Sequence, residues 1–335
     1  MDKLRIIISR PDRIGDVVLS TFMPREIKRT FPNSYVCMLV KNHTKTLYIN
    51  NPFVDKLIAV DDFDSSFSLV LEIRKQKFNY SVMLLPTEKV NWVFFAAGIK
   101  NRIGVGHKFY QFITNAKSTY RRKYIPLRHE AEYCADSLRK IGIIPQSINP
   151  EIYFSLEERN EIENIKKKYG SGSAYLIGIN STSGGSAPNL SPSEYRKLVL
   201  KLSSIAEVKV LVMDMQPAEE LSSLEGIEYP CLNLPLRNAM VQFAALDLLI
   251  APSTGPMHIA AAAKVKTLAL FCSTPACSPT LWGPLGNESK IILPEAGYCR
   301  SVCHGDAQKC DFSGEGGIDA DRIEKAVIDM LPNLK

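Results

Sequence analysis

An acidic residue at the entrance to the first predicted helix is well placed for acid–base chemistry. The loop Ser9–Asp16 follows a short apolar run, and Gly15 permits a tight backbone turn directly before Asp16. Asp is a common N-cap, and a helix N-terminus stabilises a carboxylate, so a capping role is one interpretation of Asp16. The other interpretation is a general base that accepts the proton of a substrate hydroxyl.

A second loop has the residue types of a phosphate site. The segment Ala251–His258 joins a predicted strand to a predicted helix. The backbone amides of Thr254 and Gly255, together with the Thr254 hydroxyl, can cradle a phosphate at a helix start. Pro256 suits the first helical position, and His258 falls in the first turn, within reach of a phosphate oxygen. A buried core histidine is the alternative for His258, because the residues after it are apolar.

A third loop follows another predicted strand and is rich in small hydroxyl side chains. It runs Asn180-Ser181-Thr182-Ser183-Gly184-Gly185-Ser186. Its backbone amides can wrap a diphosphate, and a flexible surface loop is the alternative. Composition alone does not separate the two.

The elements that carry these loops alternate between short apolar runs and helix-length amphipathic segments. This rhythm predicts parallel sheets covered by helices on both faces, that is, an α/β fold. The predicted strands are Leu4–Ser9, Tyr35–Val40, Tyr80–Leu85, Tyr175–Asn180, Val208–Met213, Leu248–Ala251 and Thr267–Phe271. The predicted helices are Asp16–Phe31, Phe67–Lys75, Val90–Gly98, Glu130–Ile141, Glu157–Lys168, Pro192–Ile205 with Ser191 as N-cap, Pro217–Leu224, Asn238–Leu246, Gly255–Ala263 and Ile318–Leu331.

The pattern restarts after Pro150, which predicts two α/β domains, residues 1–150 and 151–335. Two packings stay open for the final helix, one in its own domain and one back on the first domain. Ligands of open α/β sheets bind beyond the carboxyl ends of the strands, so two such domains facing each other would hold ligands in the cleft between them.

Composition and charge narrow the class of protein. Of the 335 residues, 45% are apolar and 23% are charged, which is globular composition and speaks against disorder or a coiled coil. Residues 1–150 hold 24 Lys and Arg against 13 Asp and Glu, whereas residues 151–335 hold 17 against 22. This asymmetry suggests an anionic partner for the first half, and an ordinary solvated basic surface is the alternative.

The cysteines and the N-terminus suggest a reducing, cytoplasmic location. The sequence has neither a signal-peptide pattern nor an apolar run of about 20 residues. Most of the eight cysteines are scattered through apolar runs, as is typical of free thiols. Cys299, Cys303, His304 and Cys310 are more closely spaced. Free thiols in a structural loop are favoured there, with a metal site or a disulfide left open.

Several motifs make the sequence similar to glycosyltransferase family 9, the family of the ADP-heptose:lipopolysaccharide heptosyltransferases. They are Arg13–Thr21, Asn101–Gly104, Arg128–Glu130, Ser253–Ala262, Phe271–Pro275 and Trp282–Pro284. The resemblance covers nearly the whole chain. It implies the GT-B fold, with two Rossmann-like doubly wound domains facing across a cleft. The first domain would bind the acceptor and the second the nucleotide sugar.

The resemblance also implies an activity and a set of site residues. The activity is an inverting transfer of a heptose or related sugar, with ADP-heptose as the expected donor, to lipopolysaccharide core or a similar surface glycan, without metal or cofactor. Asp16 matches the catalytic base of the family. The implied donor-binding residues are Ser181, Thr182, Ser183, Glu219 near the ribose (with Glu220 as the alternative), Met240 near the adenine, Ser253, Thr254, Gly255, Pro256, Met257 and His258. The implied acceptor-binding residues are Arg13, Gly15, Arg102, Arg121 and Arg122.

The implied acceptor is a phosphorylated, lipid-linked oligosaccharide. Besides the arginines, Lys108, Lys117 and Lys123 are expected to contact its phosphates or an anionic membrane, with Phe109, Tyr110 and Phe112 at the membrane interface. The protein would then be peripheral, at the inner face of the inner membrane. An ordinary charged loop is the alternative. The sequence shows no nucleic-acid-binding motif.

Two departures from the family leave the donor open. Ser253 stands where the family usually has Asp, and the segment Pro188–Pro192 lacks the basic residue that often precedes the helix of the second half. Two other classes also stay open. One is a GT-B sugar-nucleotide epimerase or hydrolase, which would have no acceptor site, and the other is a non-catalytic protein that binds a nucleotide sugar.

Overall fold

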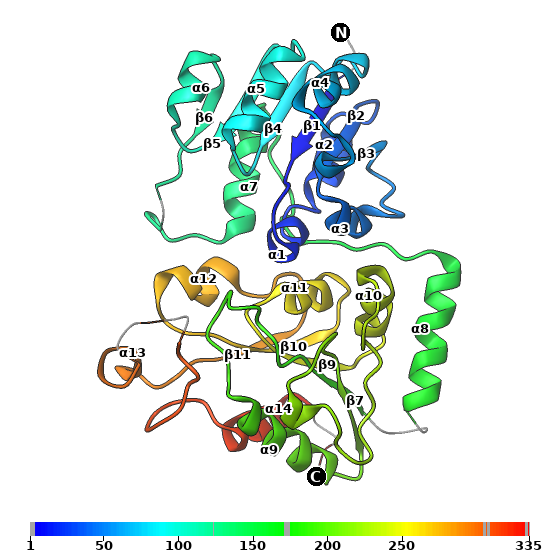
Figure 1. Ribbon diagram of the computed structural model, residues 1–335, viewed down its shortest axis with the longest axis vertical. Coiled ribbons are helices and arrows are strands. Elements are labelled where there is room, and N and C mark those ends of the chain that lie inside the picture. The colour runs from blue at the N-terminus through cyan, green and yellow to red at the C-terminus, as the bar shows by residue number, and fades with distance from the viewer. Residues whose placement is uncertain are drawn as a thin grey trace. The chain divides into compact units, whose positions relative to one another are not determined.

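The computed structural model describes residues 4–122, 124–170, 175–303, 306, 309–331 and 334 (Figure 1). The chain divides into two compact units, Met1–Tyr153 and Phe154–Lys335. The division falls just before α8 (Leu156–Tyr169), the charged helix expected between the two halves.

The first unit is built on a parallel sheet. Within the described residues, six strands take the order β3-β2-β1-β4-β5-β6. They are β1 (Arg5–Ser9), β2 (Tyr35–Val40), β3 (Lys56–Ala59), β4 (Tyr80–Met83), β5 (Asn101–Val105) and β6 (Lys117–Thr119). The strand order reverses between β1, which pairs with β2, and β4, which pairs with β1 on its other side. At such a switch point the carboxyl ends of the strands are open to a ligand.

Helices cover both faces of this sheet, as predicted. They are α1 (Ile14–Val18), α2 (Met23–Thr30), α3 (Asn42–Lys45), α4 (Ser66–Lys75), α5 (Glu88–Ala96), α6 (Phe109–Ile113) and α7 (Glu130–Arg139), with short 3-10 turns at Thr46–Tyr48 and Val60–Asp62. Ile7 packs in one cluster with Leu69 and Val93 of α4 and α5. Ile6 and Ile8 point to the opposite face and are also fully buried. Burial on both faces explains why the strand is a continuous apolar run.

The single helix predicted over Asp16–Phe31 is wrong, because the chain breaks it into α1 and α2. The amides of Ser20 and Thr21 turn back to the carbonyls three residues earlier, each at 3.0 Å. Pro24 then stands in the first turn of α2, where its missing N–H is tolerated, whereas inside a continuous helix it would remove a hydrogen bond. Asp16 therefore lies on a helix of only five residues.

The second unit repeats the architecture. Its described strands form a five-stranded parallel sheet in the order β11-β10-β9-β7-β8. They are β7 (Tyr175–Ile179), β8 (Val208–Val212), β9 (Leu248–Pro252), β10 (Lys266–Leu270) and β11 (Ser289–Ile292). After α8, the helices are α9 (Pro192–Ser203), α10 (Leu236–Ala244), α11 (Gly255–Ala262), α12 (Pro279–Trp282), α13 (Tyr298–Ser301) and α14 (Ala320–Met330), with 3-10 turns at Glu219–Leu221 and Pro275–Cys277. Ser191 caps α9 as predicted, accepting a hydrogen bond from the Glu194 amide.

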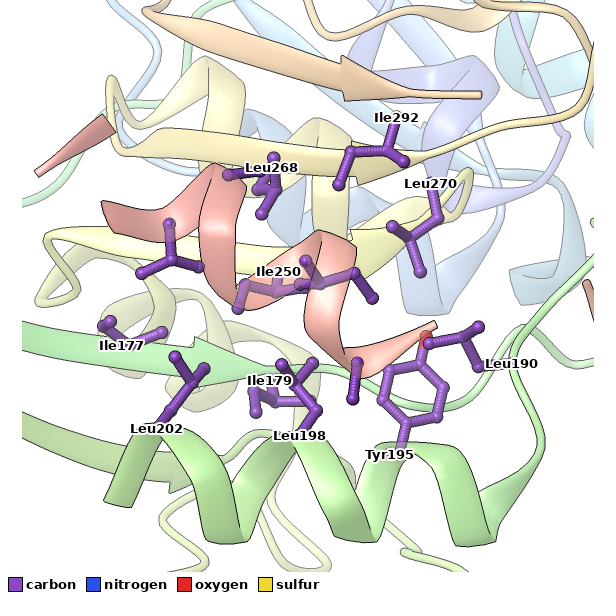
Figure 2. Packing of buried hydrophobic residues seen from close by; sticks show 14 of the residues in the cluster. Ile177, Ile179, Leu190, Tyr195, Leu198, Leu202, Ile250, Leu268, Leu270 and Ile292 are labelled. Carbon is purple, nitrogen blue, oxygen red and sulfur yellow. The ribbon is translucent and has the colours of Figure 1, made fainter. Parts of the chain in front are cut away.

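The core of the second unit lies between its sheet and two helices. Figure 2 shows side chains of α9 pointing at the strands, with Leu198 and Leu202 beside Ile177 and Ile179 of β7. The final helix, α14, contributes Ile323 to the same cluster and packs against α9. Of the two packings left open for this helix, the structure shows the one in its own unit.

The helix predicted over Pro217–Leu224 is also wrong, because only a 3-10 turn, Glu219–Leu221, forms there. The Ser222 hydroxyl donates to the Glu219 carbonyl at 2.9 Å, a local hydrogen bond that competes with a helical ladder. Among the described residues, no helix is both long and apolar enough to cross a membrane.

Candidate active site

A buried arginine holds the predicted base of the first unit. Arg10 follows β1 directly and is only 2% exposed. Its Nη2 donates to Oδ1 of Asp16 at 2.6 Å and to Oε1 of Glu130 at 2.9 Å. Its Nη1 donates to the carbonyl of Leu84, just beyond β4, at 3.2 Å. The guanidinium therefore sits at the switch point between β1 and β4 and fixes one oxygen of Asp16.

The two carboxylate oxygens of Asp16 have different surroundings. Among the described residues, the hydrogen bond to Asp16 goes to Oδ1, and Oδ2 receives none. Burial raises the pKa of Asp16 to about 6, because it outweighs the lowering effect of Arg10 and is assisted by the nearby carboxylates of Asp12 and Glu130. A carboxylate that titrates near neutral pH and keeps one oxygen open is suited to accept a proton.

Glu130 connects this arginine to a second one. It opens α7 and is 1% exposed. Besides Arg10, it binds both terminal nitrogens of Arg121, at 3.0 and 2.6 Å. The two guanidinium groups and the carboxylates of Glu130 and Asp16 thus compensate one another's charge, as burial demands. Arg10 and Glu130 were not predicted as site residues, although the first directly follows the strand before Asp16 and the second ends a family motif.

These groups line a cavity of about 450 Å³ at the carboxyl ends of β1, β4 and β5. Its volume is within the range of small-ligand sites, roughly 300–1,000 Å³. Its lining residues are Arg10, Asp12, Asp16, Leu84, Leu85, Pro86, Val105, Gly106, His107, Lys108, Arg121 and Glu130. His107 and Lys108 are exposed, so the cavity combines a buried carboxylate with a basic, solvent-accessible segment.

The predicted acceptor-binding residues differ in how accessible their side chains are to a ligand. Arg13 and Arg122 are exposed, and Gly15 lies beside Asp16 on α1. The prediction that Arg102 contacts the acceptor is corrected, because its buried guanidinium donates to the carbonyls of Ile99 and Thr114 inside the first unit. Burial also lowers the pKa of Arg102. Arg121 lines the cavity, but its charge is already matched by Glu130.

In the second unit, α11 starts directly behind β9. Thr254 is its N-cap residue, and Pro256 stands in its first turn. The first amides of a helix have no partner within the helix and bind anions readily. Ser253, Gly255 and Pro256 are partly exposed at this end of the helix. His258 is buried, at 4% exposure, which favours the alternative of a core histidine. Met257 is fully buried as well.

The loop expected to wrap a diphosphate has a different partner, a buried carboxylate. Asp214, two residues beyond β8, accepts hydrogen bonds from the amides of Ser181 and Thr182, at 2.9 and 3.1 Å, and from their hydroxyls, at 2.6 and 2.8 Å. We therefore correct the prediction for the Ser181 and Thr182 amides, which are engaged inside the protein. Ser183 remains partly exposed.

Asn180 extends this network to α11. Its side-chain nitrogen donates to Asp214 at 2.7 Å, and its side-chain oxygen accepts from the Thr254 hydroxyl at 3.5 Å. The loops after β7, β8 and β9 are thereby tied together behind the start of α11. Burial raises the pKa of Asp214, while hydrogen bonds from Ser181 and Thr182 lower it. The sequence signal that was missed is an aspartate directly after the apolar run Val208–Met213.

The last two residues predicted to bind the donor, Glu219 and Met240, differ in their exposure to solvent. Glu219 is exposed on the 3-10 turn after β8. Met240 is fully buried in α10, so its side chain does not present a surface to a nucleotide in this structure.

Three of the four closely spaced C-terminal residues lie in the described part of the chain. Cys299, Cys303 and Cys310 are partly buried free thiols, and His304 lies outside the described residues. In the part of the chain that the structure describes, no three His, Cys, Asp or Glu side chains are grouped so as to hold a metal ion.

Known proteins resemble this chain in sequence over most of its length. The sequence model of glycosyltransferase family 9 (heptosyltransferase) matches residues 66–309. A Haemophilus influenzae protein named "Putative glycosyltransferase" is 27% identical over 313 residues, which cover 88% of this chain and 90% of that protein.

Solved structures show the same fold. The crystal structure of a family 9 glycosyl transferase from Veillonella parvula matches with a TM-score of 0.81 and 19% identity, covering 99% of this chain and 98% of that one. The structure of ADP-heptose lps heptosyltransferase II from E. coli matches with a TM-score of 0.69 and 19% identity, covering 86% and 90%. The architecture is thus the GT-B fold, built from two Rossmann-like doubly wound units.

Proposed function

The chain belongs to glycosyltransferase family 9, and from this premise we propose that it transfers a heptose from ADP-heptose to a lipopolysaccharide-type acceptor. Heptosyltransferases give the family its description, and the E. coli neighbour is named as an ADP-heptose lps heptosyltransferase. The observation that carries the proposal is Asp16, whose pKa is raised to about 6 and which lines a cavity with one carboxylate oxygen fixed by Arg10.

The chemistry begins at Asp16. Its free oxygen, Oδ2, accepts the proton of an acceptor hydroxyl while Arg10 holds Oδ1. The hydroxyl oxygen then forms a bond to the anomeric carbon of the donor sugar, from the face opposite the nucleoside diphosphate. The bond from that carbon to the diphosphate breaks, so the configuration at the anomeric carbon inverts. The proton leaves Asp16 for solvent, since a carboxylate with a pKa of about 6 is mostly ionised at neutral pH.

The donor is proposed to bind to the second unit, at the start of α11. Negative charge builds on the diphosphate as the bond to the sugar breaks. The backbone amides after Thr254 and the N-terminal dipole of this eight-residue helix favour that charge. The Asp214 network supports the proposal by holding Asn180 beside this helix start, where the Thr254 hydroxyl lies 3.3 Å from the Pro252 carbonyl and 3.5 Å from the Asn180 side chain. Ser253 replaces the carboxylate that the family usually carries, and we propose that it contacts the donor sugar.

The acceptor is proposed to bind to the first unit. Its phosphates would meet exposed cations near the cavity, Lys108, Arg13 and Arg122. Such an acceptor is lipid-linked, so the protein would work as a peripheral protein at the cytoplasmic surface of an anionic membrane.

A donor screen with the purified protein tests the proposal. Nucleoside diphosphate release is measured from ADP-heptose and from other nucleotide sugars, with and without a lipid-linked acceptor. We expect release that requires both ADP-heptose and acceptor. Asp16→Asn, which keeps the size of the side chain, should bind the donor with unchanged affinity and lose about 10²–10⁴-fold in kcat.

Two results would contradict the proposal. Nucleoside diphosphate release that is as fast without an acceptor as with one would favour a hydrolase or epimerase. Normal turnover by Asp16→Asn would remove Asp16 from the role of base. Asp64→Asn is the matched control, because Asp64 is exposed in the first unit and does not line the cavity.

A further inference from the structure

Five of the eight cysteines lie in or against one hydrophobic core, that of the second unit. Cys272, two residues beyond β10, is buried in this core, and Cys277, Cys299, Cys303 and Cys310 pack against it as partly buried free thiols. The chemistry proposed above uses none of these sulfur atoms. Their closest association is in the segment between β10 and α12, which is named here the dithiol loop and runs from Cys272 to Cys277.

Several hydrogen bonds meet at the sulfur of Cys272. The backbone amide of Thr274 donates to it at 3.3 Å. The thiols of Cys277 and Cys299 also form hydrogen bonds with it, and the sulfur of Cys299 accepts one from the Ser273 hydroxyl at 3.4 Å. Donors that converge on one sulfur stabilise its thiolate form, which is the nucleophilic form of cysteine.

The two thiols of the dithiol loop share one proton. The hydrogen bond from Cys277 has the largest effect on Cys272 and, with those from Thr274 and Cys299, lowers the pKa of Cys272 to about 5 against the opposing effect of burial. The same hydrogen bond raises the pKa of Cys277. The pair therefore consists of a thiolate on Cys272 and a thiol on Cys277.

The backbone of the dithiol loop holds the two sulfur atoms together. Cys277 ends the 3-10 turn Pro275–Cys277, and its amide donates to the Thr274 carbonyl at 2.9 Å. Because the sulfur atoms are already in hydrogen-bond contact, a short approach is enough to form a bond of about 2 Å between them.

The pair lies just below the surface. Cys272 is 2% exposed, but Ser273 and Pro275 of the same loop are exposed and Cys277 is partly exposed. A small oxidant can thus reach the pair beside Cys277. Other thiols of the chain differ, since burial raises the pKa of both Cys37 and Cys134 and keeps them protonated.

The dithiol loop adjoins the start of α11. Leu270 at the end of β10 pairs with Pro252 at the end of β9, so the segments that follow the two strands leave the sheet at neighbouring positions. The dithiol loop is also attached to α12, because the Trp282 indole donates to the carbonyl of Ala276 at 3.0 Å. A change in this loop is therefore transmitted to its surroundings on both sides.

We propose that Cys272 and Cys277 form a peroxide-reactive dithiol, which closes to a disulfide and reshapes the loop beside the start of α11. The oxidation itself follows from the arrangement of the thiols. Only its consequence, weaker binding of the sugar donor in the oxidised state, rests on the proposed function.

The reaction takes place in two steps. The Cys272 thiolate attacks one oxygen of hydrogen peroxide, so that a sulfur–oxygen bond forms, the oxygen–oxygen bond breaks and hydroxide leaves, which is protonated to water. The sulfur of Cys277 then attacks the resulting sulfenic acid, so that the disulfide forms and a second water leaves. The two thiols together lose two electrons and two protons, and one peroxide becomes two waters. A dithiol reductant reverses the reaction by exchange.

Peptide mapping of the full-length protein tests the oxidation. The reduced protein is treated with hydrogen peroxide, alkylated with iodoacetamide in denaturant and digested with trypsin. Cys272 and Cys277 fall in one peptide, Thr267–Lys290, whereas Cys299, Cys303 and Cys310 each fall in a different one. We expect this single peptide to become lighter by two hydrogen atoms and to carry no alkyl group. Dithiothreitol added before alkylation should restore both alkylation sites.

Two variants identify the participants. In Cys277→Ser the oxidation should stop at the sulfenic acid of Cys272, which dimedone traps. Cys303→Ser is the matched control, because it removes another partly buried thiol that packs against the same core, and its disulfide should form as in the wild type. Circular dichroism shows whether each variant is folded.

Tryptophan fluorescence reports on the loop without any substrate. The sequence has two tryptophans, so Trp92→Phe leaves Trp282 as the reporter. A disulfide close to an indole quenches its emission. Emission should therefore fall on treatment with peroxide and recover with dithiothreitol, and it should stay constant in Trp92→Phe/Cys277→Ser. In the transfer assay, peroxide should raise the donor KM of the wild type and leave that of Cys277→Ser unchanged.

The outcomes are distinct. The proposal is overturned if peroxide leaves both sites of Thr267–Lys290 open to alkylation, or if Cys272 is instead cross-linked to the peptide of Cys299. It is also overturned if the reduced protein holds zinc that protects these thiols, since they are then metal ligands. An unchanged Trp282 emission in the disulfide form would refute the change in the loop. If neither redox form releases nucleoside diphosphate, the proposed transfer fails, while the peptide map and the fluorescence still decide on the dithiol.

Discussion

Nη2 of Arg10 lies 2.6 Å from Oδ1 of Asp16, and the arginine that makes this contact is almost completely buried. The same nitrogen contacts Glu130, 120 residues further along the chain. The protonation of Asp16 therefore depends on a group on a different helix. This dependence leads to measurable effects on activity and stability.

Activity should depend on pH through Asp16. A general base works when it is deprotonated, so kcat should fall tenfold per pH unit as the pH drops below the pKa of Asp16, about 6. A profile of kcat from about pH 4.5 to about pH 9 measures this acidic limb. If kcat stays constant down to about pH 4.5, Asp16 either is not the base or is not perturbed by burial.

Stability should depend on pH in the opposite sense. The pKa of Asp16 rises from 3.8 to about 6 on folding, so the folded protein binds this proton more tightly than the unfolded chain does. Ionisation of Asp16 then costs stability as the pH rises from about 4 to 6, and the cost, on the order of 1–3 kcal/mol, persists above that window. Asp16→Asn avoids the cost. It should raise Tm at pH 8, and the gain over the wild type should shrink as the pH falls from about 6 to about 4.

Denaturant unfolding of both proteins at several pH values measures this difference. An Asn variant that is less stable than the wild type at pH 8 (well above the pKa of about 6) would mean that the ion pair with Arg10 outweighs burial.

Glu130→Gln should move the acidic limb of the activity profile and destabilise the protein. The negative charge of Glu130 raises the pKa of Asp16, so its removal should shift the limb to lower pH. Breaking a buried ion pair by removing one partner costs about 3–5 kcal/mol, measured here as a lower free energy of unfolding. Glu132→Gln on the same helix removes partly exposed pairs with Arg128 and Arg139 and should cost about 1 kcal/mol or less for each pair, with an unchanged profile. Identical profiles for Glu130→Gln and the wild type would contradict the coupling.

Asp214→Asn should weaken donor binding. An amide in place of the carboxylate turns one acceptor into a donor that faces the amides and hydroxyls of Ser181 and Thr182. The single amide oxygen cannot accept both from Asn180, at the Oδ1 position, and from the Ser181 hydroxyl, at the Oδ2 position, so part of the network behind α11 is lost. We expect a higher KM for the donor and a loss of roughly 1–3 kcal/mol of stability.

Asp247→Asn is the matched control for this prediction. Asp247 is exposed and accepts a hydrogen bond from the amide of Leu176, near the opposite ends of β7 and β9. The donor KM should stay the same in this variant. Equal donor KM values for Asp214→Asn and Asp247→Asn would show that the network does not support the donor site.

The parts of the fold that could be predicted are those with a strong local pattern. β2 was placed at its observed bounds, Tyr35–Val40, because burial on both faces requires an uninterrupted apolar run. The start of α9 was readable from Ser191 and Pro192. β6 was missed, because Lys117–Thr119 is a short, polar edge strand whose formation depends on pairing with β5. The break before α2 was missed because Pro24 was not recognised as the first turn of a new helix, although a proline inside a continuous helix removes a hydrogen bond.

The same distinction between local patterns and long-range contacts applies to the residues of the candidate site. Asp16 could be proposed from the sequence because its position after a strand is a local feature. Arg10, Glu130 and Asp214 act through partners far away in the chain, and no local pattern shows which partner a buried charge will meet. Arg102 illustrates the reverse error, since a cation in a basic segment was expected to bind an anion, whereas the fold turns it inward to carbonyl groups.

The sharing of one guanidinium between α1 and α7 has a consequence for how the acceptor is used. With Arg10 locked in the interior on Asp16 and Glu130, the carboxylate is oriented before any sugar arrives. Preorganisation of this kind spares the substrate the entropic cost of arranging the reacting groups. Under the proposed transfer, little of the binding energy of the acceptor would be needed to orient the base.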